Sequence, residues 1–546
     1  MIEAWTADDV RAAEEPLLAA GVPLMERAAF ALATVVRRDL ARRRAVAGPD
    51  GELSDGSVRG ARVALLVGSG NNGGDALHAG AFLARRGLAV TAYLASSRVH
   101  EGGLRALHAA GGRAVGVEGA LEGGAAAAAP HRQAQGVATS VAAAAEAARA
   151  DVVVDGLLGI GARGALRGTG AELVRALLET LPAPGDPSRP WVVAVDVPSG
   201  IGTDDGSAPA PVLPADRTVT FGGAKPGLLL PPATYLAGSG AVVDIGLELP
   251  PATSPARRPA VVRLEDADVA AAWPVPGPRD HKYTRGVVGV VAGTTTYPGA
   301  AVLTTSAAVE AGAGMVRFRG PDAVGRAVVA ARPEVVTAEG RVQAWVLGPG
   351  LPASGDDDRQ RDRARAALAA ASGRLAGAQN PVPAVVDAGA LGLLDHEYPA
   401  WVVITPHAGE LAALLAARGD DVDRGRVESE PLRWARRAHE LTGATVLLKG
   451  GATVVVGPGG ACSQADAPGW LATAGAGDVL AGLLGAMLAA RAEEVVAHPE
   501  RAAEVAAAAA LVHGRAAERA NPGGPVSALA VASALPATIA ALLAQR

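Results

Sequence analysis

The sequence has 546 residues, too many for a single hydrophobic core, and therefore predicts at least two domains. Hydrophobic residues make up 49% of the chain and charged residues 19%, which excludes an intrinsically disordered protein. The net charge is −5 and no large basic block occurs, so nucleic acid is not expected as a main partner.

Cysteine usage and the N-terminal residues point to the cytoplasm. The single cysteine, Cys462, excludes internal disulfide bonds and a zinc cluster held by thiolates, and it agrees with a reducing compartment. Residues 1–5 lack the basic and apolar regions of a signal peptide. Apolar runs such as residues 479–490 are too short to cross a bilayer. We therefore expect a cytoplasmic protein with no membrane partner.

The first elements of the chain predict a nucleotide-binding turn. Residues 7–46 have a helical pattern, and a buried strand follows at residues 62–67. The strand leads into Gly-Ser-Gly-Asn-Asn-Gly-Gly-Asp at residues 68–75, and a helix is expected from about residue 76 to 86. Strand, glycine loop and helix form the phosphate-binding turn of a doubly wound α/β domain. The asparagines and Asp75 place amides and a carboxylate in a loop that does not need them for turning.

Three later strands of the first half also end in polar residues. The strands at residues 151–154, 191–195 and 217–221 lead into Asp155, into Asp196 with Ser199, and towards Lys225, respectively. Ligands of open α/β sheets bind at the carboxyl ends of the strands. One such acid is usually a loop cap, but several acids at one edge are hard to explain as caps. We therefore predict a binding site at this edge.

Taken in order, these motifs resemble the NAD(P)H-hydrate epimerase family over about residues 1–247. The resemblance implies a Rossmann-like fold and a hydrated nicotinamide dinucleotide, NADHX or NADPHX, as the ligand. It implies substrate contacts at Asn71, Asn72, Gly73, Gly74 and Asp75, at Gly159, Ile160, Gly161, Ala162, Arg163, Gly164 and Ala165, and at Asp196. It also implies that Asp196 is the catalytic carboxylate with Lys225 as its partner, and that Asn72, Asp155 and Ser199 bind potassium.

A cluster of four prolines between residues 250 and 259 predicts the domain boundary, because prolines stiffen the chain and block regular pairing. We expect one domain at residues 1–250, a linker at 251–261 and a second domain at 262–546.

The second half alternates predicted strands and helices, which is typical of an α/β domain. Its strands are expected at residues 287–292, 315–319, 344–347, 383–386, 401–404 and 445–448. Near its end, Thr-Ala-Gly-Ala-Gly-Asp at residues 473–478 precedes an apolar helical run. A glycine loop that opens a helix is a ready anion site. Asp478 is then either a helix cap or a base facing the group that meets the phosphate.

The second half resembles the ADP-dependent NAD(P)H-hydrate dehydratase family, which is similar in fold to ribokinase-like kinases. The motifs are Gly-Pro-Gly, Thr-Pro-His-Ala-Gly-Glu, Lys-Gly-Gly-Ala-Thr and Ala-Gly-Ala-Gly-Asp, spread over about residues 265–546. The resemblance implies hydrate contacts at Ala300, Gly350, His407 and Asp478, and nucleotide contacts at Lys449, Gly450, Gly451, Ala452, Thr453, Gly475, Ala476 and Gly477. Taken alone, His407 fits a structural loop role equally well. The sequence Asp387-Ala-Gly-Ala departs from the family's Asp-Ala-Asp-Ala, which puts a second acid there in doubt.

Together the two resemblances imply a bifunctional repair enzyme that epimerises NAD(P)HX and dehydrates the S form with ADP, giving AMP and phosphate. The expected fold is a Rossmann-like doubly wound domain followed by a ribokinase-like α/β domain. The expected cofactors are K⁺ in the first domain and Mg²⁺ carried by ADP in the second, in a homo-oligomer. Two alternatives stay open: a ribokinase-like kinase for a small alcohol, and a first domain that is a binding scaffold without activity.

Overall fold

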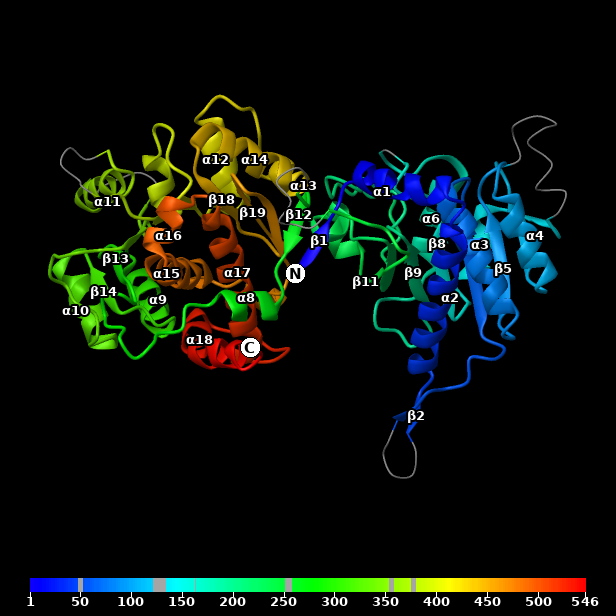
Figure 1. The fold of residues 1–546 in the computed structure, drawn as a ribbon, viewed down its shortest axis with the longest axis horizontal. Helices are drawn as coiled ribbons and strands as arrows, with labels where there is room; N and C mark the ends of the chain where they lie inside the picture. The colour runs from blue at the N-terminus through cyan, green and yellow to red at the C-terminus, as the bar shows by residue number, and fades with distance from the viewer. Residues whose placement is uncertain (48–52, 121–133, 163, 251–257, 353–357, 375–379) are drawn as a thin grey trace. The chain divides into compact units, whose positions relative to one another are not determined.

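The structure is a computed structural model, and it describes residues 1–47, 53–120, 134–162, 164–250, 258–352, 358–374 and 380–546. The chain forms two compact units (Figure 1). One unit is Glu3–Pro259, and the other is Ala260–Arg546 together with Met1–Ile2. Residues 251–257 of the predicted linker, and Arg163 of the predicted substrate contacts, lie outside the described residues.

The N-terminal unit is built on an eight-stranded parallel sheet of order β11-β10-β9-β8-β4-β5-β6-β7. Its strands are β4 (Arg62–Val67), β5 (Ala89–Leu94), β6 (Arg113–Val117), β7 (Val137–Ala138), β8 (Val152–Gly156), β9 (Trp191–Val195), β10 (Arg217–Phe221) and β11 (Ser239–Val243). On one side of β4 the strands follow in the order β5, β6 and β7, and on the other side in the order β8, β9, β10 and β11. This confirms the doubly wound topology, whose ligand crevice lies where the direction reverses, between β4 and β8.

Helices cover both faces of this sheet. They are α1 (Ala7–Ala19), α2 (Leu24–Arg43), α3 (Asn71–Ala84), α4 (Glu101–Ala109), α5 (Ser140–Ala147), α6 (Gly168–Thr180) and α7 (Pro226–Leu229), with a 3₁₀ turn, η2 (Ala233–Leu236). Along β4, Val63 and Leu65 pack in one core with α2, α3 and α4, whereas Ala64 and Leu66 pack in another with α5 and α6. Strands buried on both faces need continuous apolar sequence, which explains why β4 is apolar from Val63 to Val67, after the exposed Arg62. A separate hairpin joins β2 (Val46–Ala47) to β3 (Leu53–Ser54).

Two predicted helix boundaries in this unit are wrong. The helical pattern at residues 7–46 is divided into α1 and α2 by Gly21, whose φ is 75°, and by Pro23 at the start of α2. The helix predicted from residue 76 begins instead at Asn71, so Asn71–Asp75 form its first turns. Gly73 is there for packing rather than for turning, because a Cβ on it would lie 2.4 Å from the Gly68 carbonyl oxygen.

The C-terminal unit is built on a ten-stranded sheet of order β1-β12-β20-β19-β18-β17-β16-β15-β13-β14. Its strands are β1 (Ile2–Ala4), β12 (Val261–Arg263), β13 (Val287–Val291), β14 (Met315–Phe318), β15 (Ala344–Leu347), β16 (Ala384–Val386), β17 (Val402–Ile404), β18 (Thr445–Leu448), β19 (Thr453–Gly457) and β20 (Gly460–Gln464). The strands from β14 to β18 are parallel, whereas β18, β19 and β20 pair antiparallel. The alternating sequence pattern does not predict this antiparallel part.

Helix α15 lies at the centre of the second unit (Figure 1). The helices are α8 (Asp266–Ala272), α9 (Pro298–Glu310), α10 (Asp322–Ala331), α11 (Asp358–Ala371), α12 (Ala408–Ala416), α13 (Arg424–Ser429), α14 (Pro431–Thr442), α15 (Ala476–Ala489), α16 (Ala492–Ala497), α17 (Arg501–Ala520) and α18 (Ala528–Leu543), with 3₁₀ turns η3 (Ala388–Leu393) and η4 (Gly469–Leu471). A Cβ on Gly482 would lie 2.2 Å from the Thr304 carbonyl oxygen, and one on Gly485 would lie 2.2 Å from Val346. These glycines therefore let α15 lie directly against α9 and β15, which fixes the position of its first turn.

No single helix in the described ranges is both long and apolar enough to cross a membrane, although the bent pair α1 and α2 meets that criterion when taken together.

Candidate active sites

The first candidate site lies where β9 and β10 of the N-terminal unit end, and its centre is a buried ion pair. Lys225 Nζ donates to Asp196 Oδ1 at 2.5 Å, and also to Thr220 Oγ1 and the Phe221 carbonyl oxygen, both at 2.9 Å. The Lys225 side chain is 1% exposed and that of Asp196 is 8% exposed. A charge buried this deeply requires a partner of opposite sign, and each member of the pair supplies it to the other.

The backbone at Asp196 is strained. Its φ is 67°, unusual for a residue other than glycine, and Val197 N–H donates to the Val195 carbonyl oxygen at 2.8 Å across it. The three residues therefore form a γ-turn of the rare, strained form, and such strain is typical of functional sites. Asp196 Oδ1 also accepts from Thr220 Oγ1 at 2.8 Å and from Phe221 N–H at 3.2 Å, so the carboxylate is held rigidly.

Two further acids face this pair. Asp75, from α3, is 6% exposed, and its Oδ1 has no hydrogen-bond partner within the described part of the chain. Burial first, and then the charges of Asp196 and Glu14, raise the pKa of Asp75 well above its usual value. Glu14 comes from α1, and burial together with the Asp196 charge raises its pKa too. Sequence reasoning did not find Glu14, because it lies in an ordinary amphipathic helix with no local motif.

Helix α1 forms one wall of this site. Arg11 of α1 donates from Nη2 to the Ile160 carbonyl oxygen at 2.9 Å, which holds the predicted substrate loop at residues 159–165. The N-terminus of the helix is fixed as well, because Ala7 N–H donates to Asp204 Oδ1 at 2.8 Å.

A cluster of oxygen ligands lies at the end of β8. Ser199 Oγ donates to Asp155 Oδ1 at 2.6 Å, and Ser199 N–H donates to Asp155 Oδ2 at 2.9 Å. Both side chains are 1% exposed, and burial raises the pKa of Asp155. The Asn72 amide donates to the carbonyl oxygens of Leu158, at 3.1 Å, and of Val195. The three predicted potassium ligands therefore lie together.

The second candidate site lies at the N-terminus of α15. Gly475 precedes this helix with a φ of 86°, and no side chain caps it. Asp478 forms no hydrogen bond with any residue that the structure describes. Burial first, and then the charge of Asp387, raise the pKa of Asp478 to about 6, against the effect of Lys449. The helix-cap alternative for Asp478 therefore has no contact to support it.

Lys449 lies close to two acids, Asp387 and Glu410, and its charge also interacts with that of Asp478. Its Nζ lies 2.8 Å from Asp387 Oδ1 and 3.8 Å from Glu410 Oε2, and a Cβ on Gly477 would lie 3.4 Å from it. Burial lowers the pKa of Lys449, but these carboxylates and Asp478 outweigh it, so its pKa lies above the usual value. Asp387 also accepts from Thr405 Oγ1 at 2.8 Å. Gly389 stands where the family pattern has its second aspartate. The first aspartate of the pattern, Asp387, is present and contacts Lys449.

His407 is the N-cap of α12. Its Nδ1 accepts from Gly409 N–H at 3.1 Å and from Glu410 N–H at 3.2 Å, and Glu410 Oε2 accepts from His407 N–H at 2.8 Å. This is a reciprocal capping box. His407 thus has a structural role as a helix cap. Its side chain is also 57% exposed, and its backbone pairs with that of Lys449 at the end of β18.

The other predicted contacts of the second site lie near the start of α9. A Cβ on Gly350 would lie 2.5 Å from Ala300 Cβ, and a Cβ on Gly475 would lie 2.5 Å from Leu303 Cδ1. Sequence reasoning did not find His513 of α17, which is 6% exposed with an unpartnered Nε2 within the described chain. Its pKa is lowered to about 4 by burial, so it is neutral, and the backbone of Ala476 is its hydrogen-bond partner.

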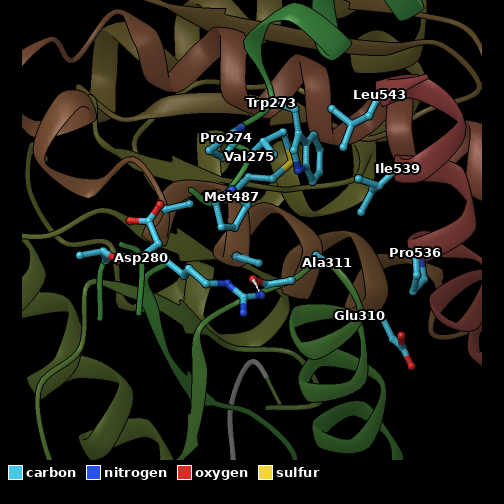
Figure 2. A pocket seen from close by; sticks show the side chains of 16 residues that line it. Trp273, Pro274, Val275, Asp280, Glu310, Ala311, Met487, Pro536, Ile539 and Leu543 are labelled. Atoms are coloured by element: carbon cyan, nitrogen blue, oxygen red, sulfur yellow. Dashed lines mark hydrogen bonds between the residues drawn. The ribbon is translucent and has the colours of Figure 1, made fainter. Parts of the chain in front are cut away.

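A cavity of about 400 Å³ lies elsewhere in the same unit. Figure 2 shows side chains that line it, among them those of Trp273, Met487, Pro536 and Ile539. The residues predicted for the second site are not among those that line it. The candidate sites are therefore defined by their charged groups and strand ends rather than by this cavity.

Comparison with known proteins agrees with two domains. Residues 21–227 match the family described as YjeF-related protein N-terminus, and residues 288–535 match the family described as NAD(P)H-hydrate dehydratase. The chain is 43% identical over 504 residues to the bifunctional NAD(P)H-hydrate repair enzyme Nnr of Mycobacterium tuberculosis, covering 89% of each chain. It is 42% identical over 558 residues to the Mycobacterium leprae protein of the same name, covering 98% of each chain. Its first half is 44% identical over 255 residues to the NAD(P)H-hydrate epimerase of Clavibacter michiganensis, covering 46% of this chain and 94% of that one.

Proposed function

This chain belongs to the family of bifunctional NAD(P)H-hydrate repair enzymes, and we propose which of its residues carry the two reactions. It is an NAD(P)H-hydrate epimerase joined to an NAD(P)H-hydrate dehydratase. Asp196 with Lys225 serves epimerisation, and Asp478 with Lys449 serves dehydration. The observation that carries the proposal is that each unit places acids and a lysine close enough to interact, at a strand end or at a helix start; Lys225 is buried, and Lys449 is partly buried.

In the epimerase, Asp196 moves a proton at the hydrated carbon whose configuration is inverted. Its carboxylate is held by three donors to Oδ1, and among the described residues no hydrogen bond reaches Oδ2. Oδ2 is therefore the oxygen that faces the ligand. Because the strained turn and the Lys225 bond fix the carboxylate, it does not need to reorganise during the reaction.

The oxygen cluster of the epimerase suits a monovalent cation. Asp155 is buried, and in the described chain no lysine or arginine pairs with it, so it lacks a compensating positive charge. The Asn72 amide nitrogen donates to the carbonyl oxygens of Leu158 and Val195. These two oxygens would also be available to hold a cation. Asn72, Asp155 and Ser199 would hold K⁺, which supplies charge compensation that fixes the substrate loop.

Replacing Asp155 with alanine is expected to weaken K⁺ binding and epimerisation together, because it removes the one charged ligand of the cluster. Epimerisation should be measured against K⁺ concentration, with the matched variant Asp151→Ala as a control at the opposite end of β8. Parental K⁺ dependence in Asp155→Ala would contradict the cation site. A crystal soaked in a heavier monovalent ion should show that ion at the Asp155 cluster.

In the dehydratase, Asp478 removes the proton of the ring hydroxyl of the S epimer, and the oxygen then attacks the terminal phosphoryl group of ADP. The uncapped N–H groups at the start of α15, with the Lys449 ammonium close to Gly477, would stabilise the charge that develops on that group. AMP leaves. The C–O bond to the phosphate then breaks with its electron pair, and the neighbouring ring carbon loses a proton to solvent, which forms the C=C bond and restores the dihydronicotinamide. Mg²⁺, carried by the nucleotide, would neutralise phosphate charge.

The direct test follows both epimers by chromatography after incubation with the protein, with and without ADP. Interconversion without ADP, and loss of the S epimer with release of phosphate on addition of ADP, is the expected result. A stable phosphorylated product would favour a ribokinase-like kinase instead. Failure of the epimers to interconvert would favour a binding scaffold in the first unit.

The two units are expected to fold and act separately, because each has its own sheet and core. Fragments 1–259 and 260–546 should each be soluble; the first should interconvert epimers and the second should consume the S epimer with ADP. Fragment 260–546 lacks Met1, whose amino group pairs with Asp268 at 2.6 Å, so a modest loss of stability is expected there. Inactive or insoluble fragments would count against independent domains.

A further inference from the structure

The third acid of the epimerase site, Asp75, has a carboxylate oxygen without a hydrogen-bond partner among the described residues. It is 6% exposed, and its Oδ1 is buried without a hydrogen bond within the described residues. Asp155, which is 1% exposed, is paired with Ser199, and Asp196 is paired with Lys225. An ionised carboxylate left in this state would bear an unrecovered cost of desolvation, whereas a protonated one carries a hydrogen that it can donate.

The single lysine of the site is not free to neutralise Asp75. An ammonium group has three N–H donors. Those of Lys225 are used by Asp196 Oδ1, Thr220 Oγ1 and the Phe221 carbonyl oxygen. The groups that face Asp75 from the surrounding elements are Asp196, Glu14 and Lys225, two acids against one base. Burial and these acids therefore favour the neutral form of Asp75.

We propose that Asp75 is the general acid of the epimerase, giving its proton to the hydroxyl oxygen that leaves the hydrated carbon. Asp196 is then the base that acts on the opposite face of the ring, and in the reverse direction of the reaction the two carboxyl groups exchange these roles. The proposal rests on the proposed function and assigns a catalytic role to a residue expected only to bind substrate. Glu14 is a positioning residue that acts through Asp75 by keeping it protonated.

The Asp75 proton joins the ring hydroxyl, the C–O bond breaks with its electron pair, and water leaves. The ring nitrogen supplies its lone pair to form a C=N⁺ bond. Water then adds to the other face, its oxygen forms the new C–O bond, and the C=N⁺ pair returns to nitrogen. Asp196 takes the proton released, and exchange with solvent restores both carboxyl groups.

The test compares full-length Asp75→Asn with the parent in epimerisation of NADHX. Asparagine keeps the shape and removes the acid, so kcat is expected to fall by about 10²-fold or more with KM little changed. In water enriched in ¹⁸O, each inversion by the parent should exchange the hydroxyl oxygen. A raised KM with parental kcat, or retention of the oxygen, would overturn the proposal.

A second pair of variants keeps the proposal testable if Asp75→Asn does not fold. Glu14→Gln removes one charge that raises the pKa of Asp75, so the basic limb of the pH–rate profile should move to lower pH. Glu15→Gln, an exposed neighbour on the same helix, should not move it. Identical basic limbs in Glu14→Gln and Glu15→Gln would overturn the proposal. A parent protein that does not interconvert the epimers would instead refute the proposed function.

Discussion

Replacing Asp478 with asparagine is expected to lower the rate of dehydration by at least about 10²-fold, while epimerisation continues at the parental rate. The reason is that asparagine keeps the shape of the side chain but cannot take a proton from the ring hydroxyl. A helix-cap role would predict a different result, since asparagine caps a helix as well as aspartate does. The measurement is phosphate release and loss of the S epimer with ADP, alongside epimer interconversion without ADP.

The matched control is Asp423→Asn, because the Asp423 carboxylate does cap a helix, accepting from Arg426 N–H at 2.8 Å. Both activities of that variant should equal those of the parent. Asp478→Asn should melt at or slightly above the parental temperature. Its folded-state pKa is raised, so the ionised carboxylate destabilises the fold at pH values above its ordinary pKa, and asparagine removes that cost. Dehydration by Asp478→Asn at close to the parental rate would show that Asp478 is not the base.

The pH dependence of dehydration should report the same group. A base is active when deprotonated, so the rate should rise as pH increases through about 6, the pKa of Asp478. The charge of Asp387 is part of the reason for that value. Its replacement by asparagine should therefore move the acidic limb to lower pH, whatever it does to the maximal rate.

The polar residues at strand ends could be predicted from the sequence, because parallel strands place their carboxyl ends at one edge whatever the details of packing. Asp155 and Asp196 were predicted in this way. Strand β9 ends before Asp196 as expected, whereas β8 continues through Asp155 to Gly156. The start of α3 could not be found by the same reasoning. Asparagine and glycine disfavour a helix by propensity, and the close approach of Gly73 to Gly68, which requires glycine there, becomes visible only in the folded structure.

Residues brought to the sites by tertiary folding were missed for another reason. Glu14 reaches the epimerase site because α1 is fixed through Arg11 to Ile160, 149 residues away. His513 reaches the start of α15 from a helix later in the chain. Neither belongs to a local motif, so no short-range pattern could indicate its position. The sequence could suggest that Lys225 pairs with Asp196, but not that Lys225 is completely buried. Because of that burial, removing one member of the pair lowers stability as well as activity.

Replacing Asp196 with asparagine is expected to stop epimerisation, by at least about 10²-fold, while the S epimer is still consumed with ADP. The R epimer should persist beyond its slow spontaneous conversion. Unlike Asp478→Asn, this variant should also melt at a lower temperature. Asparagine leaves the Lys225 ammonium buried and unpaired, and breaking a buried pair in this way costs about 3–5 kcal/mol.

The loss of activity and the loss of stability can be separated with a double variant. Asp196→Asn combined with Lys225→Met removes both buried charges, and replacing a buried pair with uncharged groups is often close to neutral for stability. The double variant should therefore recover most of the parental melting temperature yet remain unable to interconvert the epimers. If epimerisation returned together with the melting temperature, the ion pair would be structural, and the proton would be moved by another group in the site.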